Sequence, residues 1–169
     1  MPLTLTHICT TYNYANLLPE HLEGVRIQSH RPERVVVSDD ASPGDTAEAI
    51  EKACEGYADA EVIVRTENIG TSRHVNLLCN DIDTDTYIAM SADDTLVDPE
   101  FYADALKLLE QDPTLVAVWG LHQNMDEQGR LLAPRRIDSA DPQTRISAQE
   151  MRTALAYDMI VSSVCVVVR

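Results

Sequence analysis

Polar residues that can bind a ligand follow three apolar runs of the chain, each at the point where the run ends. They are Thr11-Tyr12-Asn13 after Leu3–Cys9, Asp39-Asp40 after Val35–Val37, and Asp93-Asp94 after Tyr87–Met90. Ligands of open parallel α/β sheets bind in the crevice outside the carboxyl ends of the strands. Two acidic pairs in one crevice repel each other unless a cation or hydrogen-bond donors are present. The pattern therefore points to a metal ion and a phosphorylated ligand.

Strand and helix signals alternate along the chain, as they must if strand ends are to meet at one edge. Short, mostly β-branched runs predict five strands, at Leu3–Thr11, Arg34–Ser38, Glu61–Arg65, Thr86–Met90 and Thr114–Leu121. After Gln123 a turn through Gly129 and a short helix, Ser147–Tyr157, lead to a final strand at Val161–Arg169. Repeated β-α-β units imply a mostly parallel sheet with right-handed crossovers. We expect a single α/β domain over residues 1–169.

Between these strands, apolar residues recur at helical spacing and predict four helices. The first helix is expected at Ala15–Gln28, with Pro19 tolerated near its first turn, and the second opens with a capping box at Asp45. The expected core faces are Ala47, Ile50, Cys54 and Tyr57 in the second helix; Val75, Leu78, Cys79 and Ile82 in the third; and Tyr102, Ala105, Leu106 and Leu109 in the fourth, which Asp98-Pro99-Glu100 begins.

Composition narrows the class of protein. The 169 residues are 44% hydrophobic and carry a formal net charge of −15, which argues against binding to nucleic acid or to an anionic membrane surface. The four cysteines lack metal-ligand spacing, and no signal peptide or transmembrane segment is evident. We expect a cytoplasmic protein, free or peripheral to the inner face of the membrane.

Four segments carry a resemblance to a known family: LTHICTTYN from Leu5, VVVSDDAS from Val35, ENIGTSRHVN from Glu67 and YIAMSADD from Tyr87. In this order and spacing they resemble the family 2 inverting glycosyltransferases. The resemblance implies the GT-A fold, a Rossmann-like three-layer α/β/α sandwich with a mostly parallel sheet. Neither G-x-G-x-x-G nor a P-loop occurs in the chain.

The resemblance assigns roles in nucleotide binding. Thr11 and Tyr12 would contact the base while Asn13 holds the turn, and Asp40 would accept a hydrogen bond from the uracil N–H. Arg73 would reach the base or the diphosphate. The alternatives are ordinary turn residues for Tyr12 and Asn13 and a surface salt bridge for Arg73. For Asp39 we favour a turn role near Ser42-Pro43-Gly44.

Asp93-Asp94 stands where the family has its D-x-D motif, which implies Mg²⁺ or Mn²⁺ bound with the diphosphate. The sequence departs from that motif because Ser91 replaces the first acid. Asp94 is the expected direct metal ligand, and Asp93 is placed nearer the ribose or a metal-bound water. With one carboxylate fewer, we expect metal to bind appreciably only together with the nucleotide. The alternative is an acidic turn that leads into the following helix.

The family carries its general base on an acidic motif beyond the strand that Val161–Arg169 resembles. Either the sequence is an N-terminal part of a longer transferase, or the base is supplied otherwise. In the first case we expect the final strand to expose apolar surface and to favour self-association. Glu150 and Asp158 are the nearby acids, and neither is marked as the base, so the catalytic residue stays unassigned.

The expected function is transfer of a sugar, with inversion, from a nucleoside-diphosphate sugar to an acceptor hydroxyl. The donor is expected to be a UDP-sugar, and the acceptor a glycan, a lipid-linked group or a protein. Two alternatives stay open. One is a catalytically incomplete module that binds nucleotide sugars. The other is a sugar-nucleotide pyrophosphorylase, which would need a Gly-rich, Arg-containing first loop in place of Thr11-Tyr12-Asn13.

Overall fold

Helices and strands alternate along the chain as the sequence predicts. The structure is a computed structural model that describes residues 2–44, 46–55, 57, 59–126, 128–132, 146–147, 149–150 and 165–169. The strands are β1 (Leu5–Thr11), β2 (Arg34–Asp39), β3 (Ala60–Val64), β4 (Thr86–Ser91), β5 (Ala117–Trp119) and β6 (Val166–Val168). The helices are η1 (Ala15–Leu17), a short 3₁₀ turn, then α1 (Leu18–Arg26), α2 (Thr46–Cys54), α3 (Thr71–Cys79) and α4 (Phe101–Gln111).

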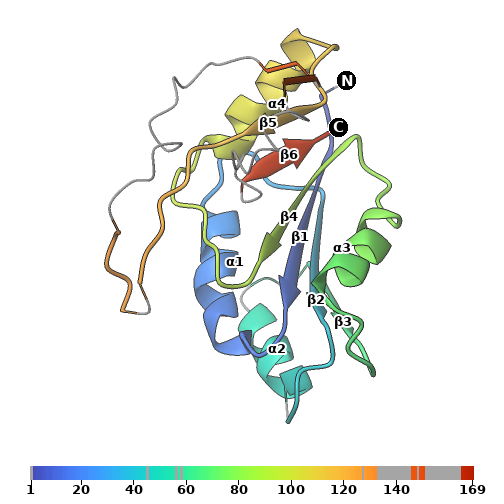
Figure 1. The fold of residues 1–169 in the computed structure, drawn as a ribbon, viewed down its shortest axis with the longest axis vertical. Helices are drawn as coiled ribbons and strands as arrows, with labels where there is room; N and C mark the ends of the chain where they lie inside the picture. The colour runs from blue at the N-terminus through green and yellow to red at the C-terminus, as the bar shows by residue number, and fades with distance from the viewer. Residues whose placement is uncertain are drawn as a thin grey trace.

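The strands form one mixed sheet in the order β3-β2-β1-β4-β6-β5. β1 pairs in parallel with β2 and β4, and β2 pairs in parallel with β3. β6 is antiparallel to both β4 and β5. In Figure 1 the carboxyl ends of β1, β2 and β4 point the same way, away from the two chain termini. The expectation of a mostly parallel sheet is confirmed.

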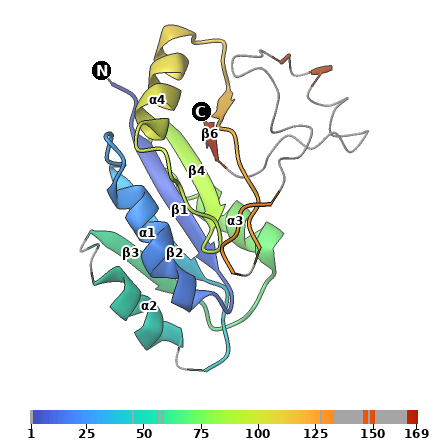
Figure 2. The same cartoon turned by 90° about the vertical axis from the view of Figure 1, so that its left-hand side faces the viewer.

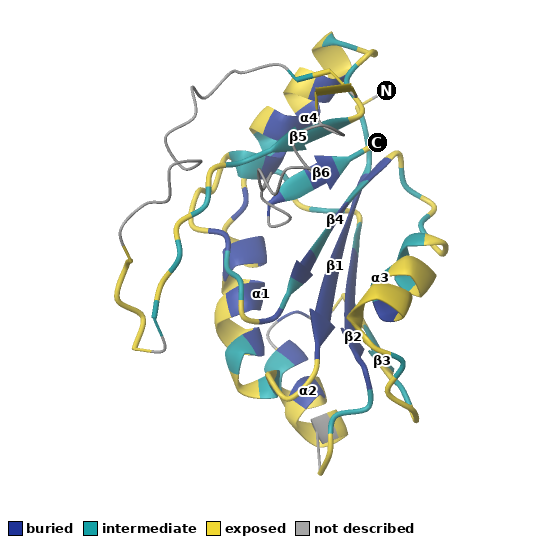
Figure 3. Cartoon of the chain, in the orientation of Figure 1, coloured by how far each residue is buried: buried dark blue, intermediate teal, exposed yellow. Residues whose placement is uncertain are grey.

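Helices lie on both faces of the sheet, which gives three layers. Figure 2 shows α1 and α2 on one side of β1 and α3 on the other. Successive side chains of a strand point to opposite faces, so Leu5 and Cys9 join the main core beneath α1, α2 and α4, whereas Ile8 points toward α3. All seven residues of β1 are buried because this strand is covered on both faces (Figure 3).

The predicted core face is confirmed in α4 and only in part in α3. In α4 the four buried residues are the predicted Tyr102, Ala105, Leu106 and Leu109. In α3 the predicted stripe is only partly buried, and the buried residue is His74. This helix is therefore turned, relative to the prediction, toward the side that carries His74.

Some predicted boundaries were wrong or fall on residues that are not described. The fifth strand is limited to Ala117–Trp119 because it pairs only with β6, at the edge of the sheet. α4 begins at Phe101, after Asp98 has accepted a hydrogen bond from the Glu100 N–H at 3.0 Å. The helix at Ser147–Tyr157 and the first part of the Val161–Arg169 strand lie largely outside the described residues, and so does Asp158.

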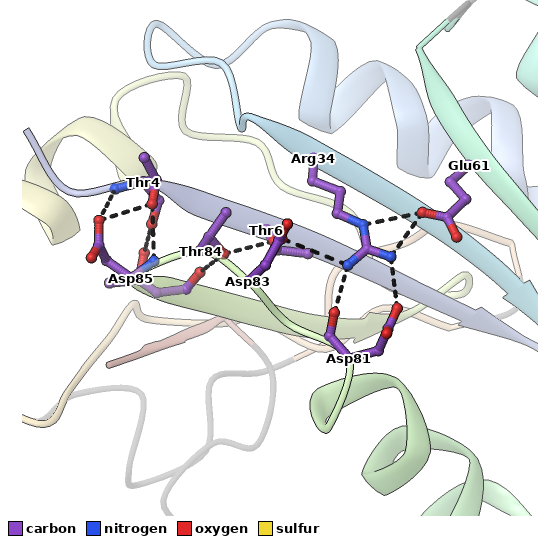
Figure 4. Close-up of polar contacts among 9 residues, drawn as sticks. Thr4, Thr6, Arg34, Glu61, Asp81, Asp83, Thr84 and Asp85 are labelled. Carbon is purple, nitrogen blue, oxygen red and sulfur yellow. Dashed lines mark hydrogen bonds and ion pairs between the residues drawn. The ribbon is translucent and has the colours of Figure 1, made fainter.

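Polar side chains close the amino end of the sheet (Figure 4). Arg34, at the start of β2, donates to the Glu61 carboxylate at 2.8 Å and to the Asp81 carboxylate at 2.9 Å. Asp85 accepts from both the N–H and the hydroxyl of Thr4, at 3.0 and 2.8 Å. These contacts join the loop before β4 to the starts of β1, β2 and β3. No helix in the described part of the chain is long and apolar enough to cross a membrane.

Candidate functional site

A cavity of about 260 Å³ lies at the carboxyl end of the sheet, where β1, β2 and β4 end and α3 begins. It is lined by Thr10, Thr11, Tyr12, Tyr14, Asp40, Asn68, Gly70, Thr71, His74 and Ser91. Members of the first two polar groups, Thr11, Tyr12 and Asp40, therefore meet at one edge, as expected for an open α/β sheet. From the third strand, Ser91 lines the cavity, and Asp93 and Asp94 are not among its lining residues.

The end of β1 and the turn that follows it place Thr11 and Tyr12 at this cavity. Thr11 is 3% exposed, and among the described residues its hydroxyl has no hydrogen-bond partner. Tyr12 is 44% exposed, so much of its ring is open to solvent or to a ligand. Asn13 turns the chain at a φ of 64°, a left-handed conformation that asparagine tolerates better than most residues. The buried, unpartnered Thr11 hydroxyl is the kind of group that a ligand satisfies.

A hydrogen-bond relay ties this turn to the one after β2. The Asn13 N–H donates to Ser42 Oγ at 2.8 Å, and the Ser42 hydroxyl in turn donates to the Asp39 carboxylate. Asp39 also accepts from the Ser42 N–H at 2.8 Å. Between them Ala41 has a φ of 60°, which is strained for a residue with a Cβ. Asp39 therefore has the turn role that its sequence position suggested.

Asp40 holds the start of α3 against the cavity. Its two oxygens accept the N–H groups of Ile69 and Gly70 at 3.0 and 2.8 Å, and the Arg65 guanidinium lies 3.6 Å from the carboxylate. Gly70, with a φ of 81°, is the N-cap of α3. An ionised carboxylate can accept about four hydrogen bonds, so these donors leave acceptor capacity on the cavity side. The first acidic pair is thus neutralised by hydrogen-bond donors and one arginine.

His74 is a cavity residue that the sequence reasoning missed as a site residue. It is 2% exposed, and its Nε2 lies 2.7 Å from the Ser38 hydroxyl. Burial lowers the pKa of its imidazole, partly opposed by Asp40. Arg73, which the sequence assigned to the site, is exposed and is not among the residues that line the cavity. The signal that could have found His74 is its place on the first turn of α3, behind the Asn68–Gly70 turn.

Among the described residues, fewer hydrogen-bond donors contact the second acidic pair than the first. Asp93 is exposed and Asp94 is half-buried, two and three residues after Ser91, which lines the cavity. Burial, with a smaller contribution from Asp93, raises the pKa of the Asp94 carboxyl, and His122 opposes this shift. A nearby cation would relieve the same electrostatic cost.

These two acids fit one mode of metal binding. No group of three or more His, Cys, Asp or Glu side chains that could hold a metal ion occurs in the described part of the chain. Mg²⁺ is commonly bound by one or two carboxylates together with phosphate oxygens of the substrate. Asp93 and Asp94 can supply the carboxylates of such a shared site, with the other ligands coming from a diphosphate and water.

Comparison with known proteins agrees with this geometry. A sequence profile of glycosyl transferase family 2 matches residues 6–162. No curated protein matches the chain significantly. Among solved structures, the mannosyltransferase PcManGT from Pyrobaculum calidifontis, in complex with GDP-Man and Mn²⁺, is 28% identical with a TM-score of 0.62. The match covers 69% of this chain and 35% of that one.

TarS from S. aureus has the same fold at lower identity. Its 1–349 structure is 23% identical over 64% of this chain and 33% of that chain, with a TM-score of 0.55. The complex of TarS 1–349 with UDP-GlcNAc is 24% identical, with a TM-score of 0.52, over 64% of this chain and 32% of that one. The chain therefore spans about a third of the length of these structures.

Proposed function

Since this chain belongs to glycosyl transferase family 2, we propose that its cavity binds the nucleoside-diphosphate part of a sugar donor. The proposal rests chiefly on the buried Thr11 hydroxyl, which has no hydrogen-bond partner among the described residues and lines the same cavity as Asp40 and Tyr12. In this arrangement Thr11 and Tyr12 contact the nucleoside, and Asn13 fixes the turn that carries them.

Uracil is the base that we propose for the donor. Its N3–H can donate to an Asp40 oxygen beside the Ile69 and Gly70 N–H groups. Cytosine has a lone pair at the same ring position, which would repel the carboxylate. Arg73, although exposed in this structure, lies next to the cavity residue His74 and is proposed to reach the diphosphate.

The acid pair completes the proposed donor site. Asp94 would bind a divalent cation directly, and Asp93 would contact the ribose or a water on the cation. When bound with the donor, Mg²⁺ or Mn²⁺ would neutralise negative charge on the departing diphosphate. The residues of this chain would orient the donor so that an acceptor hydroxyl can attack the anomeric carbon from the face opposite the leaving group, which gives inversion.

A module that binds the donor without transferring the sugar is a second candidate. Asp40 is the single acid among the cavity-lining residues of the described part, and backbone N–H groups already occupy it. A positioned general base typically raises the rate of such a transfer by about 10²–10⁴-fold, so a site without one would bind the donor and transfer the sugar slowly. The family match favours either candidate over a sugar-nucleotide pyrophosphorylase.

The test is a thermal-shift panel of UDP, dTDP, GDP and CDP, each with and without Mn²⁺. We expect UDP and dTDP to raise the midpoint more than CDP, and Mn²⁺ to enlarge the UDP shift. A GDP shift larger than the UDP shift would replace uridine by guanosine. No shift with any nucleotide would remove the donor site altogether.

A further inference from the structure

A chain of buried hydrogen bonds crosses the interior from α4 to the second acidic pair. Tyr102 Oη lies 2.6 Å from His7 Nδ1, and His7 Nε2 lies 2.8 Å from His21 Nε2. His21 Nδ1 lies 2.6 Å from the backbone carbonyl oxygen of Asp94. All three side chains are at most 1% exposed. Figure 2 shows why they can meet, since α1 and α4 flank β1 on the same side.

The partners at the two ends of this chain settle where its protons lie. A carbonyl oxygen only accepts, so His21 Nδ1 must carry a hydrogen. Both rings are at most 1% exposed, and a buried imidazolium is costly, so each ring is neutral and has one N–H. His21 Nε2 is then an acceptor, His7 Nε2 a donor and His7 Nδ1 an acceptor, which leaves the Tyr102 hydroxyl as the first donor. Every hydrogen bond in the chain points toward Asp94.

Other contacts hold the segment around Asp94 against α1. The Thr95 hydroxyl donates to the Glu20 carbonyl at 3.2 Å. A Cβ on Gly24 of α1 would lie 2.7 Å from the Leu96 carbonyl oxygen, so the helix approaches this segment as closely as a glycine allows. On one side of Asp94, a hydrogen bond from the Ala92 N–H holds the end of β4 to β1. On the other side, Thr95 and Leu96 are held against α1. His21 therefore fixes the backbone of Asp94 between these two points.

We propose that His21 is a positioning residue for the Asp93–Asp94 pair, held in its donating tautomer by Tyr102 and His7. By anchoring the Asp94 backbone, it aims the Asp94 carboxylate at the site of the cation that accompanies the nucleotide. This inference rests on the proposed donor site. A histidine that merely filled the core would affect stability but leave the coupling between cation and nucleotide unchanged.

Nitrogen NMR of the metal-free protein tests the proton order directly. We expect long-range ¹⁵N–¹H spectra to show His21 as the Nδ1–H tautomer and His7 as the Nε2–H tautomer at pH 7. His21 as the Nε2–H tautomer would overturn the proposal, because it could not then donate to the Asp94 carbonyl.

Two substitutions of His21 separate positioning from core packing. In H21N the amide nitrogen stands close to the position of Nδ1 and can still donate to Asp94, whereas in H21Q it stands close to Nε2 and cannot. UDP affinity is measured by calorimetry with and without Mn²⁺. We expect the Mn²⁺-dependent gain in UDP affinity to be about tenfold smaller in H21Q than in the wild type. A loss of this size is at the lower end of the effects seen when groups that orient metal ligands are removed. H21N should keep most of this gain, and the metal-free affinity should stay within about twofold in both.

The wild-type arm keeps the two proposals apart. If Mn²⁺ does not change UDP affinity in the wild type, the metal part of the proposed function fails. If it does, and H21Q behaves like the wild type, the positioning role alone is overturned. Should H21Q not fold, Y102F decides: it keeps both histidines but removes the donor that fixes the His7 tautomer. We expect Y102F to weaken the Mn²⁺ effect in the same direction, and an unchanged effect would overturn the proposal.

Discussion

The two ends of this sheet use polar residues in opposite ways. At the amino end the side chains bind one another: Arg34 is held by Glu61 and Asp81, and Asp85 is held by Thr4 (Figure 4). At the carboxyl end Asp39 and Asp40 accept mainly backbone N–H groups, which shapes two turns around a cavity. These turns include left-handed conformations at Asn13 and Ala41.

The two ends also differ in the surroundings of their buried polar atoms that have no hydrogen-bond partner in the described structure. At the carboxyl end, the Thr11 hydroxyl has no hydrogen-bond partner among the described residues, and the other such atom there, Arg65 Nε, faces the Asp40 carboxylate at 3.6 Å. At the amino end the comparable atom, His30 Nε2, still faces the Glu33 carboxylate at 3.9 Å. A buried polar group without a partner destabilises the folded state by about 1–3 kcal/mol. Such a group is expected where a ligand completes the structure, so the comparison points to the carboxyl end for binding and to the amino end for stability.

Substituting one acid at the carboxyl end should give the largest effect. We expect Asp94→Ala to abolish the Mn²⁺-dependent part of UDP binding and to leave the fold intact, because burial already opposes the charge on this carboxylate. Asp93→Ala should do so less completely. Calorimetry of UDP with and without Mn²⁺ measures the effect.

The control for this substitution lies at the other end of the sheet. Arg34→Ala should lower the free energy of unfolding by about 1 kcal/mol and leave the Mn²⁺ effect unchanged. Unchanged Mn²⁺ coupling in Asp94→Ala would show that the metal assignment is wrong.

Asp40→Asn should produce the next largest effect, on base selectivity. The amide keeps an acceptor for one of the Ile69 and Gly70 N–H groups, but it weakens the site that accepts the uracil N3–H. We expect UDP to lose about 1–3 kcal/mol of binding free energy. CDP should gain affinity, because a neutral amide no longer repels the cytosine N3 lone pair. Competition binding of the two nucleotides measures this ratio. A UDP-to-CDP ratio equal to that of the wild type would exclude base reading by Asp40.

Two buried threonines on β1 offer a matched pair with effects of about 1 kcal/mol in opposite directions. Thr11→Val removes a hydroxyl without a hydrogen-bond partner in the described structure, so the free energy of unfolding should rise while UDP affinity falls. Thr6→Val removes a hydroxyl that lies 2.7 Å from Thr84 Oγ1, so stability should fall and UDP affinity should not change. Urea denaturation and calorimetry of both variants provide the two readings. Destabilisation by Thr11→Val would mean that this hydroxyl is satisfied within the protein.

A change of pH should give the smallest effect. Burial lowers the pKa of His74 and of His7 in the folded state, whereas in the unfolded chain both titrate near 6.5. The unfolded state therefore binds more protons below this pH, and stability falls as the pH is lowered. Between pH 7 and 6 we expect a loss of at most about 1 kcal/mol per histidine, measured by urea denaturation. His74→Gln should show a smaller loss, and an equal loss would exclude His74 as a source.

The fold was predictable because its signals are periodic and local. The valines of β2 and the spacing of Tyr102, Ala105, Leu106 and Leu109 in α4 define buried surfaces without reference to distant residues. The limit of this reasoning shows at the cavity, where the sequence predicted Arg73 and the structure places His74 instead. One residue corresponds to a rotation of about 100° around a helix, and the N-cap at Gly70, held by Asp40, sets that rotation.

The contacts that shape the site were not predictable because they join residues far apart in the sequence. Nothing local to His7, His21 and Tyr102 indicates that their side chains meet, since 95 residues separate His7 from Tyr102. The roles of Thr11, Asp40 and Asp94 in ligand binding stay predictions, although the structure places the first two around one cavity.

The most direct measurement is to locate bound UDP on the ¹⁵N-labelled protein by NMR, in the presence of Mg²⁺. We expect the amide signals of Thr11, Tyr12 and Gly70 to shift with increasing UDP, while those of Thr4 and Asp85 at the opposite end stay in place. Shifts confined to the amino end, or none at the three carboxyl-end amides, would contradict the assignment of this cavity as the donor site.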